Sequence, residues 1–324
     1  MKICSLLPSG TEILFALGLG EQIVGVSDLC NYPPEAGSKH VVSRSKIDVD
    51  VLTSDQVEEM IQQLLSTGES PYDLDNDWIL NNPPDVVLTQ DLCFFCEVDA
   101  GQVQEAVEGM AEPPNVLVLQ PGTVQQIFDT IAQIGDACGA ADASVNLVQG
   151  LRNRVEFITQ RLRGIKYRPK VFSLEGINPI VIGGHWIPDL LQLAGGRQEM
   201  FPPGSPAVRP NWEEICGWAP EKLYIDLCSS DLTRNRREIP WLAGQPGWED
   251  IPAVQNGEVY LLDHVYFSNP GPRIVDGLEI LAQLTHPEQF SGYIRPNTVL
   301  KLDVDAAHAC SPGDIGACFR PFPA

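Results

Sequence analysis

The sequence predicts an α/β protein of two lobes, each built around a parallel sheet, with one long helix joining them. Short apolar strands alternate with amphipathic helices in both halves of the chain, a rhythm typical of parallel sheets with right-handed crossovers. Helical periodicity without proline runs from Ala141 to about Ile165. At 1.5 Å per residue this segment would be about 36 Å long, more than a crossover inside one small lobe needs. The length of 324 residues also fits two ordinary domains.

The first half of the chain contains the pattern of one lobe. Strands are expected at residues 2–7, 22–27, 85–89 and 115–119. The last two are the clearest, because they are short, β-branched and bounded by proline or glycine turns. Helices are expected at residues 11–17, 54–66, 72–81 and 123–138. Ser54 or Asp55 is placed to cap the second of these helices.

The second half repeats the alternation of strands and helices. Strands are expected at residues 170–174, 222–227 and 258–262, and helices at residues 185–193 and 273–284. From about Thr298 the periodicity is lost, which indicates an extension that is docked on the body or mobile. The chain therefore divides into an N-terminal α/β lobe (1–122), a helical linker with the long helix (123–166), a C-terminal α/β lobe (167–295) and an irregular tail (296–324).

Composition and charge narrow the possible partners. Hydrophobic residues make up 44% of the chain, enough for a folded core. The formal net charge of -22 argues against nucleic acids and anionic membranes as partners, because both need clusters of Lys and Arg. No apolar run reaches the ~18 residues of a membrane span, and the N-terminal apolar stretch is broken by Pro8, Ser9 and Gly10. We therefore expect a cytoplasmic protein without membrane insertion, whose nine cysteines are free, metal-bound or redox-active.

Four segments carry a resemblance to a known family. They read SLLPSGTEILFALGLGEQIVGVS, PPDVVLTQDLCFFCEV, INPIVIGGHWIPDLLQLAGG and SNPGPRIVDGLEILA. In this order, and over residues 1–295, the chain resembles the class III solute-binding proteins of ABC transporters, the cobalamin and iron-chelate type. It is most similar to a signal-less, cytoplasmic-looking branch with a Cys-x-x-Cys.

The resemblance implies a fold and a function. It implies two Rossmann-like lobes with a ligand cleft between them, and a non-catalytic protein that holds a small molecule there. The first expectation for that molecule is a corrinoid such as cobalamin, or a related tetrapyrrole. Transport receptors of this type deliver their ligand to an ABC permease, and the lack of a recognisable signal sequence argues against such a partner here.

Candidate ligand-binding residues follow from a rule for open α/β sheets, in which ligands lie beyond the carboxyl ends of the strands. Polar residues after the strands and aromatic residues near them are therefore expected to contact the ligand, since aromatic side chains supply large apolar contacts for a flat macrocycle. These residues are Ser9, Thr11, Asp28, Gln90, Phe94, Phe95, Glu175, Trp186, Trp212, Trp241, Tyr266 and Phe267.

Thiols and imidazoles at the same strand ends leave a metal site as an alternative. The candidate ligands are Cys30, Cys93, Cys96, His185, Cys228 and His264. Thiolate and imidazole groups suit Zn or another thiophilic metal. Two further interpretations stay open: the cysteines contact the ligand without a metal, or they are buried structural residues. A thiol-based enzyme using Cys93 or Cys96 is a third function, although Glu97 and Asp99 oppose thiolate formation.

Two other groups of residues attract notice. The basic segment from Arg234 to Arg237 is expected to be a solvated loop or to contact an anionic edge of the ligand. His308, Cys310 and Cys318 in the tail have a loose metal-ligand spacing without a turn to support it. No phosphate-binding loop or dinucleotide fingerprint occurs, because the Gly18-Leu19-Gly20 segment follows a helix rather than a strand.

Overall fold

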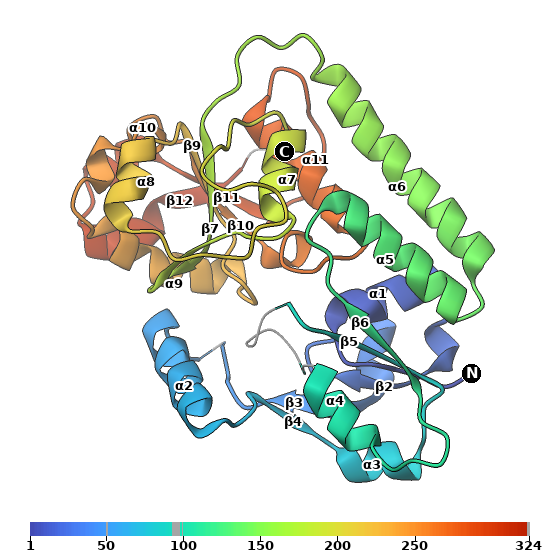
Figure 1. The fold of residues 1–324 in the computed structure, drawn as a ribbon. Coiled ribbons are helices and arrows are strands. Elements are labelled where there is room, and N and C mark those ends of the chain that lie inside the picture. The colour runs from blue at the N-terminus through green and yellow to red at the C-terminus, as the bar shows by residue number, and fades with distance from the viewer. Residues whose placement is uncertain (50, 93–97, 99, 323–324) are drawn as a thin grey trace. The chain divides into compact units, whose positions relative to one another are not determined.

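The computed structural model describes residues 1–49, 51–92, 98 and 100–322 (Figure 1). The chain forms two compact units. The first comprises Met1–Asp48, Val57–Pro121 and Gln125–Arg152, and the second comprises Val49–Gln56, Gly122–Val124 and Asn153–Ala324. The boundary between the units falls within one long helix, α6 (Ala141–Arg161), whose 21 residues confirm the long helix expected from the periodicity.

The first unit contains a six-stranded mixed sheet in the order β4-β3-β2-β1-β5-β6. All neighbouring strands are parallel except β3 and β4. The chain builds the sheet outward from β1 to β4 and then returns to the other side of β1, so the strand order reverses between β1 and β5. The strands are β1 (Ile3–Ser5), β2 (Ile23–Ser27), β3 (His40–Ser45), β4 (Tyr72–Leu74), β5 (Val86–Gln90) and β6 (Asn115–Leu119).

The helices of the first unit pack onto this sheet. Helix α1 contacts β1 and β2, and α4 contacts β5 and β6. Besides α6 they are α1 (Pro8–Ala16), α2 (Ser54–Thr67), α3 (Asn76–Asn81), α4 (Ala100–Val107) and α5 (Val124–Ala137), with 3-10 turns η1 (Gly20–Gln22) and η2 (Pro34–Ser38). Pro8 lies in the first turn of α1, where its missing N–H is not needed.

One expected helix of this unit is instead two elements. Residues 72–81 were expected to be helical throughout, but Tyr72–Leu74 pairs antiparallel with β3. The side chain of Asp75 then accepts a hydrogen bond from the backbone N–H of Trp78 at 2.9 Å, which caps the start of α3. The helical pattern therefore begins only at the cap.

The second unit contains a second six-stranded mixed sheet, in the order β12-β11-β10-β9-β7-β8. Strands β7, β9 and β10 are parallel, and the three outer pairings are antiparallel. Both sheets are therefore mixed rather than purely parallel. The strands are β7 (Val171–Ile177), β8 (Ile180–Ile182), β9 (Lys222–Ile225), β10 (Val259–Leu262), β11 (Val299–Leu302) and β12 (Phe319–Pro321).

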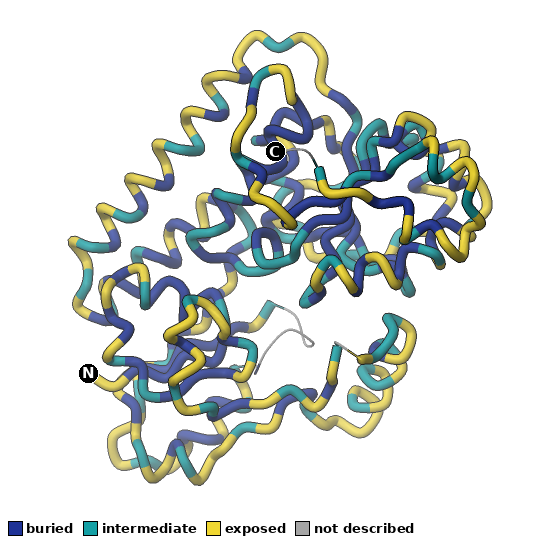
Figure 2. The backbone as a smooth tube through the Cα atoms, turned by 180° about the vertical axis from the view of Figure 1, so that it is seen from behind, coloured by how far each residue is buried: buried dark blue, intermediate teal, exposed yellow. Residues whose placement is uncertain are grey.

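The helices of the second unit surround a core of sheet residues. In Figure 2 the strands of both sheets are largely dark blue, which marks them as buried. The helices are α7 (Ile187–Leu193), α8 (Trp212–Trp218), α9 (Leu232–Ala243), α10 (Pro252–Gln255), α11 (Ile274–Thr285) and α12 (Val304–His308), with 3-10 turns η3 (Trp248–Asp250), η4 (His264–Tyr266) and η5 (Pro312–Cys318). Within the described part of the chain, no helix has the length and apolar character needed to cross a membrane.

Two sequence expectations about the second unit are wrong. The tail 296–324 is not irregular, because β11, α12, η5 and β12 fold there and Leu302 pairs with Phe319 across the two added strands. These strands have only four and three residues, too few to show a periodic pattern. The basic segment is not a loop but part of α9, which begins where Asp231 accepts a hydrogen bond from the Arg234 backbone N–H at 2.8 Å.

Candidate ligand-binding residues at the strand ends

In the first unit, the side chains of Thr11 and Cys30 lie close to Ser5, the last residue of β1. The Thr11 hydroxyl lies 2.9 Å from Ser5 Oγ and 3.1 Å from Cys30 Sγ, within hydrogen-bonding distance of both. Ser9 is buried beside them in the first turn of α1. Burial, and then the neighbouring Cys30, raise the pKa of the Cys4 thiol to about 12. The Cys4 thiol is therefore protonated at neutral pH.

Asp28 and Gln90 follow two other strands of the same sheet. Asp28 is exposed, and its carboxylate accepts a hydrogen bond from the Ser45 backbone N–H at 3.1 Å, which links the ends of β2 and β3. Gln90 ends β5 and is buried, and neither its Nε2 nor the buried hydroxyl of Ser43 on β3 has a hydrogen-bond partner among the described residues. Buried polar groups normally have partners, so these two are candidates to meet a ligand.

Four residues that were predicted to contact a ligand or a metal come shortly after β5 in the sequence but lie outside the described residues. They are Cys93, Phe94, Phe95 and Cys96. Their assignment as ligand or metal contacts stays a prediction.

In the second unit, Asp226 occupies the end of β9. Its carboxyl group is buried, with 1% of the residue exposed, and accepts a hydrogen bond from Ser173 Oγ at 2.6 Å. Burial, and to a lesser extent the nearby Cys228, raise the pKa of Asp226 to about 8 against the smaller opposing effect of the Ser173 hydrogen bond. Asp226 is therefore mainly a neutral acid at pH 7, and its Oδ2 has no hydrogen-bond partner within the described part of the chain.

The neighbouring strand ends are tied together by backbone and side-chain bonds. Cys228 is half-buried, and its backbone N–H donates to the carbonyl oxygen of Glu175 at 3.0 Å. Asn235 is fully buried on α9 and donates from Nδ2 to the Leu262 carbonyl oxygen at the end of β10, at 2.9 Å. After β10, Asp263 caps the turn that contains His264. These residues form a rigid polar edge.

Sequence reasoning did not single out Ser43, Ser173 or Asn235. Ser43 and Ser173 lie inside strands and Asn235 lies within a helix, so the rule that selects residues after strands passes over them. The unusual feature of each is a polar side chain at a buried position. A sequence shows that feature only when the buried face of the element is already known.

Trp186, Tyr266 and Phe267 form an internal bracket in the second unit. All three are buried, and the indole Nε1 of Trp186 donates to the backbone oxygen of Phe267 at 2.7 Å. The bracket joins the turn before α7 to the turn after β10. These aromatics therefore support the strand ends through packing and this hydrogen bond.

His185 precedes Trp186 in an unusual conformation. Its φ is 53°, in the left-handed region that costs a non-glycine residue about 1 kcal/mol. Two backbone hydrogen bonds hold it there, from its N–H to the Ser205 oxygen at 2.6 Å and from the Gly204 N–H to its own oxygen at 2.9 Å. Burial lowers the pKa of the imidazole, so His185 is neutral at pH 7 and has a lone pair to offer a ligand.

The two remaining predicted tryptophans have different surroundings. Trp212 is buried, stacks on Trp248 with centroids 6.3 Å apart, and donates from Nε1 to the Pro246 oxygen at 2.7 Å. This places Trp212 in the hydrophobic core. Trp241 on α9 is 38% exposed.

The described residues contain no candidate metal site. No group of three or more His, Cys, Asp or Glu side chains that could hold a metal ion occurs among them. Cys30, His185, Cys228 and His264 are described, and they do not form such a group there. Cys93 and Cys96 lie outside this range, so a metal centre that includes them stays a prediction.

Two α/β units with polar strand ends are the architecture of many solute-binding proteins. A sequence model described as periplasmic binding protein matches residues 3–266, and the chain belongs to this family. The membership confirms the resemblance seen in the sequence and the expectation of a non-catalytic binding protein, so the thiol-based enzyme is not supported.

Individual relatives are similar over most of the chain. An uncharacterized ABC transporter substrate-binding lipoprotein of Bacillus subtilis is 25% identical over 298 residues, covering 89% of this chain and 81% of the relative. A vitamin B12-binding protein of Vibrio cholerae is 24% identical over 282 residues, covering 86% of each.

Solved structures have the same fold. The periplasmic vitamin B12-binding protein of Vibrio cholerae has a TM-score of 0.64 at 20% identity, covering 90% of this chain and 98% of its own. A periplasmic heme-binding protein of Roseiflexus has a TM-score of 0.65 at 20% identity, covering 88% and 98%. These similarities confirm the two-lobed α/β fold.

Proposed function

We propose that this protein binds a corrinoid, or a related tetrapyrrole, without altering it chemically. The proposal rests on the relatives that are vitamin B12-binding proteins. One of them is 24% identical to this chain, and the similarity covers 86% of the chain. Similar structures also include heme-binding proteins and a possible iron-binding protein, so heme and ferric chelates are the competing ligands.

The chemistry of the strand ends favours a corrinoid over heme. The polar residues selected after the strands are uncharged or acidic: Ser9, Thr11, Asp28, Gln90 and Glu175. The basic residues nearby lie on α9, where Arg234 is buried and donates to Ser230 Oγ at 2.8 Å, and Arg236 donates to the Phe319 backbone oxygen at 2.7 Å. Asp226 adds a neutral acid and His185 a neutral imidazole at pH 7. The amide side chains around a corrin ring can donate to and accept from such groups. The two propionates of heme need basic partners, and the arginines of α9 already donate hydrogen bonds to protein oxygens.

A titration of the purified protein tests this proposal. We expect cyanocobalamin to saturate the protein at one molecule per chain in calorimetry, and hemin to bind at least tenfold more weakly. Tenfold corresponds to about 1.4 kcal/mol, within the range of one charge-assisted hydrogen bond. Tighter binding of hemin or of a ferric chelate would refute the corrinoid assignment. Elemental analysis of the protein as purified tests the alternative metal site, since zinc without any cobalt or iron would support it.

The role and location of the protein are further parts of the proposal. The Bacillus subtilis relative is named as a substrate-binding component of an ABC transporter, which supports delivery of the ligand to a permease. Co-purification with a permease from the same genome would test that role. The cytoplasmic location expected from the sequence stays a prediction, and cell fractionation followed by immunoblotting would decide it.

A further inference from the structure

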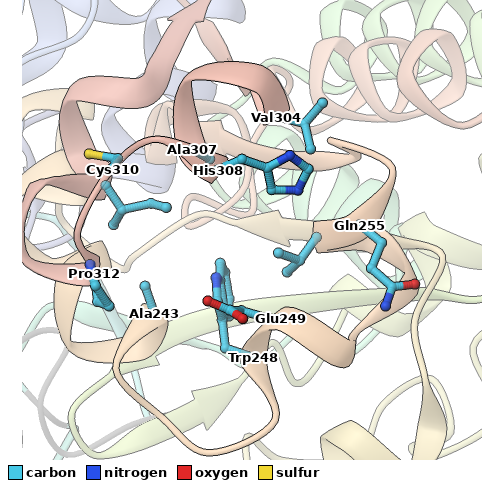
Figure 3. A pocket seen from close by; sticks show the side chains of 11 residues that line it. Ala243, Trp248, Glu249, Gln255, Val304, Ala307, His308, Cys310 and Pro312 are labelled. Atoms are coloured by element: carbon cyan, nitrogen blue, oxygen red, sulfur yellow. The ribbon is translucent and has the colours of Figure 1, made fainter.

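A pocket lies inside the second unit, away from the strand ends discussed above. Its cavity of about 360 Å³ is open to solvent and is lined on one side by η3, α10 and the end of α9, and on the other by α12 and η5 (Figure 3). The lining of the second side begins at Val304, beyond the residues 3–266 that match the family. One side of the pocket therefore comes from the family-matched region, and the other side comes from the C-terminal segment that follows it.

The apolar part of the pocket is rigid. Its floor is Trp248, which is buried and stacks on Trp212 with an interplanar angle of 23°. Ile315 on η5 contributes to the opposite wall. The following residue, Gly316, lies so close to α9 that an added Cβ would be 2.3 Å from the Arg236 backbone oxygen. This close packing fixes η5 against α9, so the wall is preformed rather than mobile.

The polar part of the pocket has one sign of charge. Glu249 and Gln255 come from one side and His308 from the other, and Figure 3 shows the Glu249 carboxylate between the two walls. No Lys or Arg lines the pocket within the described part of the chain. The protein as a whole has a net charge of -22, which adds to the attraction of a cation and the repulsion of an anion.

From this lining we infer that the pocket binds a small amphipathic amine. Its ammonium group would pair with Glu249, and its aromatic or aliphatic body would pack against the partly exposed Val304 and Ala307, above the edge of Trp248. The cavity volume lies at the lower end of the range for small-molecule sites, which fits a single ring with a short side chain. An ammonium near an indole ring and a carboxylate gains from both, since the face of an indole attracts cations.

Phenethylamine is a suitable probe, with phenylacetate as the ligand control of similar size and opposite charge. We expect phenethylamine to bind in saturation-transfer NMR and calorimetry, and phenylacetate not to bind. Glu249→Gln keeps the shape of the side chain and should weaken phenethylamine about two- to fivefold, the range for an exposed ion pair. Glu213→Gln on α8 removes an exposed carboxylate that does not line the pocket, and should leave the affinity unchanged.

A second variant tests the location independently of charge. Ala307→Phe places a ring in the cavity from α12 and should abolish phenethylamine binding while cyanocobalamin binding stays as it was. Equal binding of phenylacetate, an unchanged affinity in either pocket variant, or no phenethylamine binding at all would overturn the inference. Because cobalamin is titrated separately, a failure here is distinguishable from a failure of the proposed function.

Discussion

The buried acid at the end of β9 makes the stability of this protein depend on pH in an unusual direction. The pKa of Asp226 is about 8 in the folded state, mainly because of burial, against an ordinary value of 3.8. Between these pH values the folded state holds a proton that the unfolded state has released. Its stability therefore falls as the pH rises, by about 1.4 kcal/mol per unit.

The substitution Asp226→Asn isolates this contribution. The amide has the same shape, and its oxygen can still accept the hydrogen bond from Ser173. Because the variant cannot ionise, its stability relative to the wild type should rise by about 2.7 kcal/mol between pH 5 and pH 7. This difference does not require an exact pKa, provided that the folded-state value lies above 7.

Urea unfolding followed by tryptophan fluorescence at pH 5, 6 and 7 measures the effect. Asp136→Asn, at an exposed position on α5, is the matched control and should leave the pH dependence unchanged. Parallel pH curves for the wild type and Asp226→Asn would refute the reasoning, because they would mean that Asp226 ionises in the folded state as an ordinary aspartate does. Infrared absorption of a protonated carboxyl group, lost in the variant, gives a direct second measurement.

Three further predictions concern local stability. Trp186→Phe retains an aromatic ring but loses the indole hydrogen bond to the Phe267 backbone oxygen, and should destabilise the protein by about 1 kcal/mol in thermal unfolding. An unchanged stability would contradict the role of this hydrogen bond. Asp75→Ala removes the cap of α3 and should cost about 1 kcal/mol, whereas Asp77→Ala in the same helix should cost less; equal losses would argue against the cap. His185→Gly should be about 1 kcal/mol more stable than His185→Ala, because only glycine adopts a φ of 53° without strain, and the reverse order would contradict this.

The fold was predictable where local pattern and tertiary structure agree. The strand at residues 115–119 was expected with the bounds that the structure has, because a short β-branched run bounded by turns has few alternatives. β4 was missed because Tyr72–Leu74 becomes a strand only by pairing with β3, a contact between segments far apart in the sequence. The same applies to β11, which pairs with β10, and to β12, which pairs with β11.

The candidate site was predictable only in outline. The strand-end rule selected Asp28 and Cys228, which do follow strands of the two sheets, but Glu175 lies inside β7, because that strand continues to Ile177 rather than ending at residue 174. It gave no information on burial, so it treated Trp212 and Trp241 alike although one lies in the core and the other is exposed. It also gave no information on protonation, which depends on how completely the surrounding chain excludes water.

The C-terminal strands also determine how far this chain can be shortened. β11 covers the free side of β10, and β12 in turn covers β11, so the last three-residue strand forms the outer border of the sheet. A chain that ended at the family boundary near residue 266 would leave the backbone N–H and C=O groups of β10 uncovered on that side. Uncovered strands of this kind recruit other chains and promote aggregation. The segment outside the family match therefore covers a strand edge, and we expect a chain shortened to residue 266 to self-associate.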